Sequence, residues 1–207
     1  MEISVNLAVL VITVLVSLAA FQDRNVQDRL LFQPYAVQHR GQWYRLITHA
    51  FIHADTMHLV VNMFVLWSFG NGVERLLPLI TPLGGGLAYA LLYLGGAVFA
   101  TLPGMAKHRD DPNYRSVGAS GAVSAVVFAQ IVMLPTHRIT LFFIQDLPAW
   151  LFGGLYLLYS YMMDKRAGDN VAHDAHFYGA VFGVLFTFAL RPELLLHFGM
   201  LERALGH

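Results

Sequence analysis

Residues 117–134 read VGASGAVSAVVFAQIVML, and Pro135 follows them directly. The stretch contains no Asp, Glu, Lys or Arg. A helix that crosses the hydrocarbon core of a bilayer needs about 20 mostly apolar residues, and proline ends a helix because it lacks a backbone N–H. This stretch therefore predicts a membrane-spanning helix with one serine, Ser120, near its beginning.

Five further stretches have the same apolar character, and they predict membrane-spanning helices over about residues 3–21, 57–72, 76–102, 139–163 and 171–190. The helix over 139–163 is interrupted by Asp146 and Pro148. No linker rich in Ser, Pro or Gly and no repeat of fixed period divides the chain. The sequence therefore predicts an all-α, polytopic membrane protein, with six transmembrane helices in a single integral-membrane domain over residues 1–207.

The composition supports this prediction and excludes several other classes of protein. Of the 207 residues, 57% are hydrophobic and 13% are charged, whereas a soluble domain has about 25% charged residues. Lys and Arg balance Asp and Glu at 13 each, so no nucleic-acid partner is indicated. The lack of cysteine excludes disulfides, a cysteine nucleophile and a thiolate metal site. The first connection, residues 22–56, mixes aromatic and polar residues, which is typical of a loop in the membrane interface.

The polar residues inside the predicted helices are concentrated at one depth. His58 and Asn62 lie in the first turns of the second helix, Ser120 lies in the first turn of the fourth, and His176 lies near the start of the sixth. Even-numbered helices all begin on the same side of the membrane, so these side chains are expected near one face. Polar groups at membrane depth are costly and indicate function by default.

Small residues indicate how these helices approach one another. Ser120 is flanked by glycines, and the sixth helix has a G-x-x-x-G that begins three residues after His176. Glycine permits close approach of two helix backbones, so contact between the fourth and sixth helices would bring His176 beside Ser120. The residues expected to pack the helices at the site are Gly118, Gly121, Gly179 and Gly183.

This set of side chains has the chemistry of a serine nucleophile site. A serine needs an adjacent base to attack at neutral pH, and His176 would supply that base. His58 and Asn62 are spaced i, i+4 on one helix face and can donate hydrogen bonds. Together with the backbone N–H of Ser120 at a helix N-terminus, they would form an oxyanion site. The prediction requires no metal and no cofactor.

Four motifs, in this order along the chain, resemble those of the rhomboid intramembrane serine proteases. They are Trp43-Tyr44-Arg45 in the first loop, His58-x-x-x-Asn62 in the second helix, Gly118-Ala119-Ser120-Gly121 at the fourth, and Ala175-His176-x-x-Gly179-x-x-x-Gly183 in the sixth. The resemblance implies a rhomboid-like helix bundle with an interfacial first loop. It also implies structural roles for Trp43, Arg45, Glu74 and Arg75.

The resemblance implies a serine endopeptidase that cleaves peptide bonds in or next to transmembrane helices of single-pass or multi-pass membrane-protein substrates, near helix-destabilising residues. Ser120 would attack, and His176 would act as general base and then as general acid. It further implies a multi-pass protein of the bacterial inner membrane, with its active site toward the extracytoplasmic face. The distribution of Lys and Arg among the connections favours the reverse orientation.

Two features depart from the family pattern. The tryptophan–arginine motif of the first loop has an extra residue, Tyr44. Members often have an aromatic ring one turn after the nucleophile that packs on the catalytic histidine, whereas this chain has Ser124. Tyr178, His173 and Asp174 are the candidates for orienting His176, and the sequence does not rank them.

Two alternative classes are open at this point. A histidine-box membrane metalloenzyme would use the histidines at 49, 53, 58, 173 and 176, although the chain has no adjacent histidine pair of the kind such sites usually contain. A structural role is expected for His49, His53 and His173 instead. A non-catalytic relative would bind transmembrane helices without cutting them, but such relatives usually lack the serine or the histidine.

Overall fold

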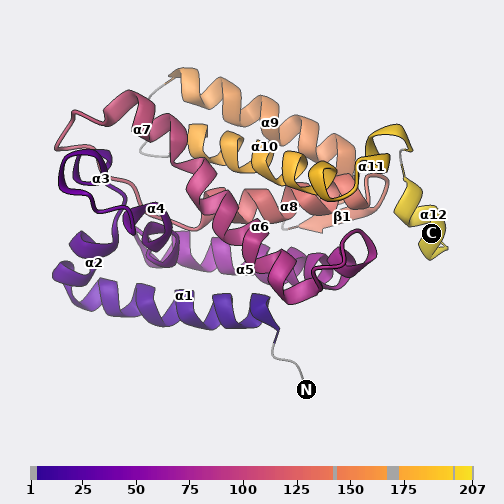
Figure 1. The fold of residues 1–207 in the computed structure, drawn as a ribbon, viewed down its shortest axis with the longest axis horizontal. Helices are drawn as coiled ribbons and strands as arrows, with labels where there is room; N and C mark the ends of the chain where they lie inside the picture. Colours follow the sequence, from indigo (N-terminus) through magenta and orange to yellow (C-terminus); the bar gives the residue numbers. More distant parts are fainter. Residues whose placement is uncertain (1–3, 142–143, 167–172, 198, 207) are drawn as a thin grey trace.

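The computed structural model describes residues 4–141, 144–166, 173–197 and 199–206, which form a mostly helical bundle (Figure 1). The elements are α1 (Val5–Gln22), α2 (Arg24–Leu30), α3 (Pro34–Arg40), α4 (Arg45–Thr48), η1 (His49–Phe51), α5 (Thr56–Leu76), η2 (Leu77–Leu79), α6 (Gly85–Ala100), α7 (Leu102–His108), α8 (Ser120–Met133), β1 (Arg138–Leu141), β2 (Ile144–Pro148), α9 (Ala149–Arg166), α10 (His173–Leu190), α11 (Glu193–Leu196) and α12 (Met200–Leu205). Helices α1 and α9 are outermost on opposite sides, with α8 between them (Figure 1).

Several of the described helices are apolar enough to lie in a membrane. Two helical stretches, Val5–Gln22 and Gly85–His108, are long enough to cross one. A third results if Arg45–Phe51 and Thr56–Leu79, which are bent by 95° at a short break, are counted as one span. Three shorter apolar helices are Ser120–Met133, Ala149–Ser160 and Asp174–Leu190.

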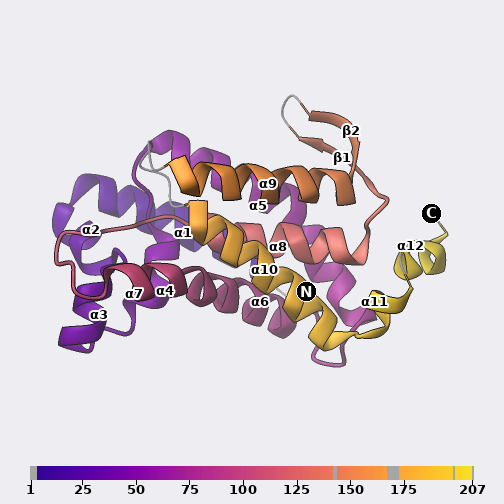
Figure 2. The same cartoon turned by 90° about the horizontal axis from the view of Figure 1, so that it is seen from above.

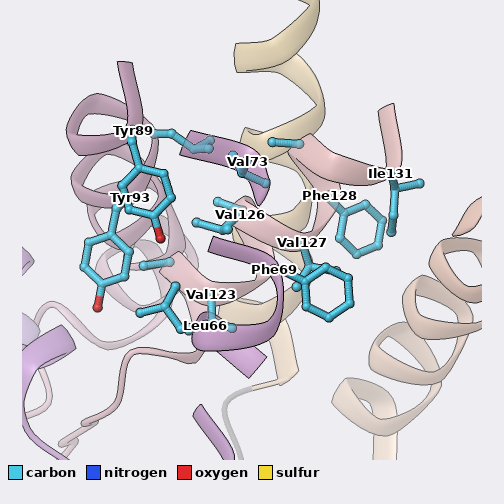
Figure 3. Packing of buried hydrophobic residues seen from close by; sticks show 14 of the residues in the cluster. Leu66, Phe69, Val73, Tyr89, Tyr93, Val123, Val126, Val127, Phe128 and Ile131 are labelled. Carbon is cyan, nitrogen blue, oxygen red and sulfur yellow. The ribbon is translucent and has the colours of Figure 1, made fainter. Parts of the chain in front are cut away.

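Helix α8 is the centre of the bundle. It packs against α5, α6, α9 and α10, and nearly all of its side chains are buried. At a rise of 1.5 Å per residue its 14 residues extend about 21 Å, less than the roughly 30 Å of a bilayer core. Figure 3 shows its aliphatic and aromatic side chains against those of α5 and α6; the labelled residues are Val123, Val126, Val127, Phe128 and Ile131 of α8, Leu66, Phe69 and Val73 of α5, and Tyr89 and Tyr93 of α6.

Helices α8 and α10 meet through their backbones. A Cβ added at Gly179 would collide with the backbone of Gly121, and one added at Gly183 would collide with the backbone of Ala125. The G-x-x-x-G of the sixth predicted helix therefore lies directly on the helix that begins with Ser120.

The predicted fifth helix begins too early. Strands β1 (residues 138–141) and β2 (residues 144–148) pair antiparallel and project from the bundle beside one end of α9 (Figure 2), and α9 begins only at Ala149. Asp146 lies within β2, opposite the register shift between Ile139 and Leu141, and it has a φ of 56°. Its carbonyl accepts a 2.7 Å hydrogen bond from Arg138 Nη1. Pro148 lacks the N–H that a continuous helix would need. The described fold is therefore not all-α.

The predicted boundaries near residues 72–85 are also wrong. Helix α5 continues to Leu76 rather than ending at 72, and α6 begins at Gly85 rather than at 76. The 3-10 turn η2, which contains Pro78, and a further turn lie between them. Hydropathy could not separate the end of one helix from the beginning of the next, because the connection is itself apolar.

The charged residue Glu74 is accommodated near the end of α5 by hydrogen bonds to its carboxylate. Its carboxylate accepts hydrogen bonds from Ser4 Oγ at 2.6 Å, Val5 N at 2.8 Å and Asn6 N at 3.1 Å, at the N-terminus of α1. An anion is stabilised there by the unpaired N–H groups and the dipole of the helix. Glu74 thus joins the end of α5 to the beginning of α1.

The first connection, expected as an interfacial loop, contains α2, α3, α4 and η1. These helices and α7 gather at the end of the bundle opposite to α11 and α12 (Figures 1 and 2). Arg45 is buried and donates from Nη1 to the carbonyls of Asp28 and Leu31 at 2.8 and 2.7 Å, and from Nε to Gln42 Oε1 at 2.6 Å. Arg45 therefore holds the connection together.

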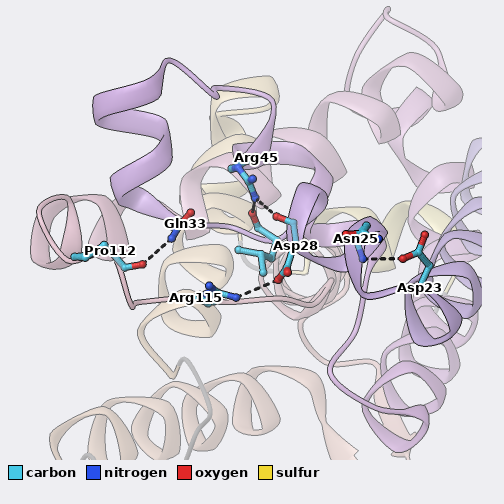
Figure 4. Close-up of polar contacts among 8 residues, drawn as sticks. Asp23, Asn25, Asp28, Gln33, Arg45, Pro112 and Arg115 are labelled. Carbon is cyan, nitrogen blue, oxygen red and sulfur yellow. Dashed lines mark hydrogen bonds and ion pairs between the residues drawn. The ribbon is translucent and has the colours of Figure 1, made fainter.

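Two further contacts join this connection to the segment before α8 (Figure 4). Arg115 Nη1 donates to the Asp28 carboxylate at 3.0 Å, and Gln33 Nε2 donates to the carbonyl of Pro112 at 2.7 Å. The segment that leads to Ser120 is thus tied to the helices of the first connection.

Candidate active site

Ser120 and His176 are in direct contact. Ser120 is the first residue of α8, His176 lies in the first turn of α10, and 2.7 Å separates Ser120 Oγ from His176 Nε2. The close backbone contact at Gly121 and Gly179 brings the two helix beginnings together. A histidine nitrogen at this distance can accept the proton of the serine hydroxyl.

The loop before Ser120 has a conformation that requires glycine. Gly118 has a φ of +124°, and a Cβ there would lie 2.6 Å from Cε1 of His58. Gly118 therefore packs against the His58 ring rather than between helices, unlike Gly121, Gly179 and Gly183. Its N–H donates to the carbonyl of His49 at 3.0 Å, which anchors the loop to the first connection.

His53 is a second anchor of this loop. Its Nε2 accepts a 3.4 Å hydrogen bond from the N–H of Ala119, so Nδ1 carries the proton and donates to Ser17 Oγ at 3.0 Å. Ser17 in turn donates to the carbonyl of Phe51 at 3.1 Å. Burial is the main reason that the pKa of His53 is lowered to about 3, with the neighbouring His58 adding to the effect. His53 is therefore neutral and links α1 to the loop beside the nucleophile.

His58 and Asn62 lie one turn apart on α5. Asp55 caps this helix by accepting from the His58 N–H at 2.8 Å. Asn62 is buried and donates from Nδ2 to the carbonyl of His58 at 2.8 Å. One of its two amide hydrogens is thus used within α5. The His58 ring lies against Gly118, two residues from Ser120.

The beginning of α8 offers backbone donors. The first N–H groups of a helix have no acceptor within it, and the helix dipole makes this end partly positive. The N–H of Ser120 is among these groups, so an oxygen that gains negative charge beside Ser120 would be stabilised there.

A small cavity adjoins the site. Its volume is about 20 Å³, which is enough for one water molecule. Its polar lining includes His49, Thr101, Ser116 and Asp174, and it reaches Ala175 beside the candidate base. The buried Nδ1 of His49 has no hydrogen-bond partner within the described residues. Neither Thr101 nor Ser116 stood out in the sequence, because a single hydroxyl residue carries no pattern.

Two of the three residues considered for orienting His176 make other contacts. The Asp174 carboxylate accepts from Lys107 Nζ at 3.1 Å and from the N–H of Ala175 at 2.8 Å. Tyr178 is 39% exposed and packs on Phe99. The side chain of the third, His173, lies outside the described part of the structure.

A ring beside His176 comes instead from α9, which contains none of the three candidate residues. The Tyr156 ring is nearly parallel to that of His176, with 6.5 Å between the centroids and 24° between the planes. Its hydroxyl is 2.7 Å from Ser124 Oγ. The apolar pattern of α9 does not distinguish the face that meets α8 from the lipid-facing one, so the sequence held no signal for Tyr156.

In the described ranges, no three His, Asp or Glu side chains are grouped closely enough to hold a metal ion. Within these ranges, the histidine-box alternative has no ligand cluster to use. The fold and the site together define a polytopic helical membrane protein in which a serine and a histidine meet at the beginnings of two closely packed helices.

Comparison with known proteins identifies the family. The profile of the Rhomboid domain family matches residues 40–193, which is most of the chain. The chain belongs to the rhomboid family, whose members are generally intramembrane serine proteases.

Similar proteins come from plants and animals. The chain is 31% identical over 148 residues to RHOMBOID-like protein 12, mitochondrial, of Arabidopsis thaliana, covering 68% of this chain and 44% of that protein. It is 29% identical over 151 residues to the human Presenilin-associated rhomboid-like protein, mitochondrial, covering 69% of this chain and 36% of that protein. It is 28% identical over 171 residues to Rhomboid-related protein 1 of Caenorhabditis elegans, covering 79% of this chain and 44% of that protein. The chain spans less than half the length of these relatives.

These relatives overturn the expected location. The sequence resemblance implied a bacterial inner membrane, with the active site toward the extracytoplasmic face. The similar proteins are eukaryotic, and two of the three described above are named as mitochondrial. The bacterial assignment is wrong, and the charge distribution had already disagreed with the orientation that came with it.

Proposed function

We propose that this protein is an intramembrane serine endopeptidase with a Ser120–His176 dyad. The observation that carries the proposal is the 2.7 Å contact between Ser120 Oγ and His176 Nε2 in a chain of the rhomboid family. Membrane proteins are the substrates of proteases in this family, and we propose peptide bonds in or next to their transmembrane helices as the sites of cleavage. The reaction needs neither a metal nor a cofactor.

The dyad would work in two stages. His176 Nε2 takes the proton of Ser120 as Oγ attacks the carbonyl carbon of the substrate, and it then gives that proton to the leaving amine. This forms an acyl-enzyme and releases the first product. His176 next takes a proton from water, which attacks the ester, and returns it to Ser120 Oγ as the second product leaves.

Three groups would stabilise the negative oxygen of the tetrahedral intermediate. The N–H of Ser120 lies at a helix N-terminus, Asn62 has a second amide hydrogen, and the His58 ring lies against Gly118. Their support is their position: His58 and Asn62 lie one turn apart on α5, and Ser120 follows the loop whose Gly118 packs on His58. Gly121, Gly179 and Gly183 would serve this site by keeping α8 and α10 in backbone contact.

We further propose that six helices cross the bilayer as a single domain: α1, α5, α6, α8, α9 and α10. Each contains an apolar stretch, including the three that are short by length alone. The two ends of the bundle differ, since α2, α3, α4 and α7 gather at one end. The loop before Ser120 is hydrogen-bonded to the first connection, from the N–H of Gly118 to the carbonyl of His49. Trp43 is 60% exposed and Tyr44 is 47% exposed, which fits contact with the membrane interface at that end.

The dyad is tested by cleavage of a single-pass substrate in proteoliposomes, together with labelling by a fluorophosphonate that forms a covalent bond with an activated serine. Ser120→Ala is expected to abolish both readouts, and His176→Ala is expected to reduce both to background. Asn62→Ala should be labelled slowly and should lower kcat by about 10²-fold, the effect of removing one oxyanion donor.

Cleavage of the substrate by the Ser120→Ala variant would contradict the proposal. Labelling of a folded wild-type protein that cuts no membrane substrate would favour the non-catalytic relative. Iron or zinc bound in stoichiometric amount, with activity lost on chelation, would favour the metalloenzyme. Circular dichroism of each variant checks that the helical fold is retained.

We propose a mitochondrial membrane as the location, on the basis of the names of the similar plant and animal proteins. A tagged chain expressed in a eukaryotic cell is expected to sediment with mitochondrial membranes and to resist extraction by alkaline carbonate. Recovery in the endoplasmic reticulum or at the plasma membrane would contradict this location without affecting the dyad.

A further inference from the structure

We propose that Tyr156 is a positioning residue that holds the imidazole of His176 in line with Ser120, an inference that rests on the protease function proposed above. The two rings are nearly parallel, at 24°, and their centroids are 6.5 Å apart. Offset parallel rings at this separation attract one another. The tyrosine ring therefore forms a wall beside the imidazole, on the α9 side of the site.

The Tyr156 ring is anchored to the helix that carries the nucleophile. Its hydroxyl is 2.7 Å from Ser124 Oγ, and Ser124 is only 4% exposed. Ser124 lies four residues after Ser120, so both project from the same face of α8. One face of one helix thus presents the nucleophile and the group that fixes the ring beside the base.

Other rings limit the movement of Tyr156. Phe128 of α8 lies 5.6 Å from it, centroid to centroid, at 52°, and Phe152 of α9 lies 6.2 Å from it at 28°. A ring that is packed against two others and hydrogen-bonded at its tip has little freedom to rotate. It can therefore define the orientation of a neighbouring ring.

The contact with Ser120 Oγ acts on one atom of the imidazole, Nε2. Rotation about the Cβ–Cγ bond is restricted by what lies beside the ring. Asp174 and Tyr178 are engaged with Lys107 and Phe99, respectively, so these two are directed elsewhere. A displacement of about 1 Å in a catalytic group can lower a rate by about 10²-fold.

The test measures kcat, KM and the rate of fluorophosphonate labelling in reconstituted variants. Tyr156→Leu removes the ring and is expected to lower kcat and the labelling rate by at least about tenfold, with KM within about twofold. Tyr156→Phe keeps the ring and should therefore lose much less of the labelling rate, about threefold. The matched control is Tyr159→Leu, which alters a 57% exposed tyrosine of the same helix and should behave as wild type.

A second comparison isolates the hydrogen bond. Ser124→Ala and Tyr156→Phe each remove it, so each is expected to lower the labelling rate by about threefold, and the double variant by no more than either single one. Additive losses would overturn the proposal, as would wild-type labelling of Tyr156→Leu or a loss confined to KM. If Tyr156→Leu fails to fold, the labelling rates of Tyr156→Phe and Ser124→Ala still test the proposal. An unlabelled wild-type protein would instead contradict the proposed protease function.

Discussion

Helix α8 has two contrasting neighbours. Toward α10 it presents Gly121 and Ala125, whose backbones lie against Gly179 and Gly183 with no side chain between them. Toward α9 it presents longer side chains, with Phe128 and Ile131 lying against Gly153. The first interface is backbone on backbone, whereas the second is filled by side chains of α8 that pack on Gly153 and on the Tyr156 ring.

The difference shows that one interface sets the distance between Ser120 and His176, whereas the other supports the His176 ring. A backbone contact has no rotamers to adjust, so it fixes the distance between Ser120 and His176 rigidly. Side chains can yield by a few tenths of an ångström, so the α9 interface is suited to supporting the base rather than to setting the dyad distance. One glycine at each interface, Gly179 and Gly153, and the unpacked Gly154 as a control allow this contrast to be tested.

The largest effect is expected at Gly179. In Gly179→Ala, the new methyl group meets the backbone of Gly121, so α8 and α10 must separate. We expect a loss of about 3 kcal/mol in stability and a fall of about 10² in kcat/KM, because Ser120 and His176 move apart. Thermal unfolding in detergent measures the stability, and substrate cleavage measures kcat/KM. Wild-type activity in this variant would break the distinction between the interfaces.

A smaller effect is expected at Gly153, on the α9 side. In Gly153→Ala the methyl group would lie 3.1 Å from Ile131 Cδ1, which is the flexible end of a side chain. We expect a change in stability within about 1 kcal/mol and cleavage within about twofold of wild type. Gly154→Ala is the control, because nothing lies within 4 Å of the added atom, and its gain in helix propensity is worth up to about 1 kcal/mol. Equal losses of stability and cleavage in Gly153→Ala and Gly179→Ala would show that the two interfaces are equally rigid.

Much of the proposed site could be predicted from the sequence because it depends on short spacings. The order of the helices places Ser120 and His176 at one depth, and the glycine spacing after His176 indicates which helix face is in close contact. Asn62 and His58 follow from the i, i+4 rule. Each of these relations is local to one helix or depends only on helix order.

The remaining features depend on contacts between distant segments. Tyr156 is one aromatic residue among several in an apolar helix, and only packing shows that it lies beside His176. Strands β1 and β2 are predicted as helix because their apolar composition meets a hydropathy criterion, although Asp146 and Pro148 disfavour a helix. The end of α5 was placed too early because the partner of Glu74 is the beginning of α1, which hydropathy cannot reveal.

The enclosure of α8 has a consequence for how the protein would respond to its lipids. A helix exposed to acyl chains must match the bilayer thickness by tilting or by distorting the lipid, and that adjustment changes the depth of its side chains. Helix α8 is surrounded by α5, α6, α9 and α10 rather than by lipid, and it is shorter than the hydrocarbon core. The depth of Ser120 is therefore set by protein packing, and hydrophobic mismatch in a thinner or thicker membrane would act on the outer helices instead.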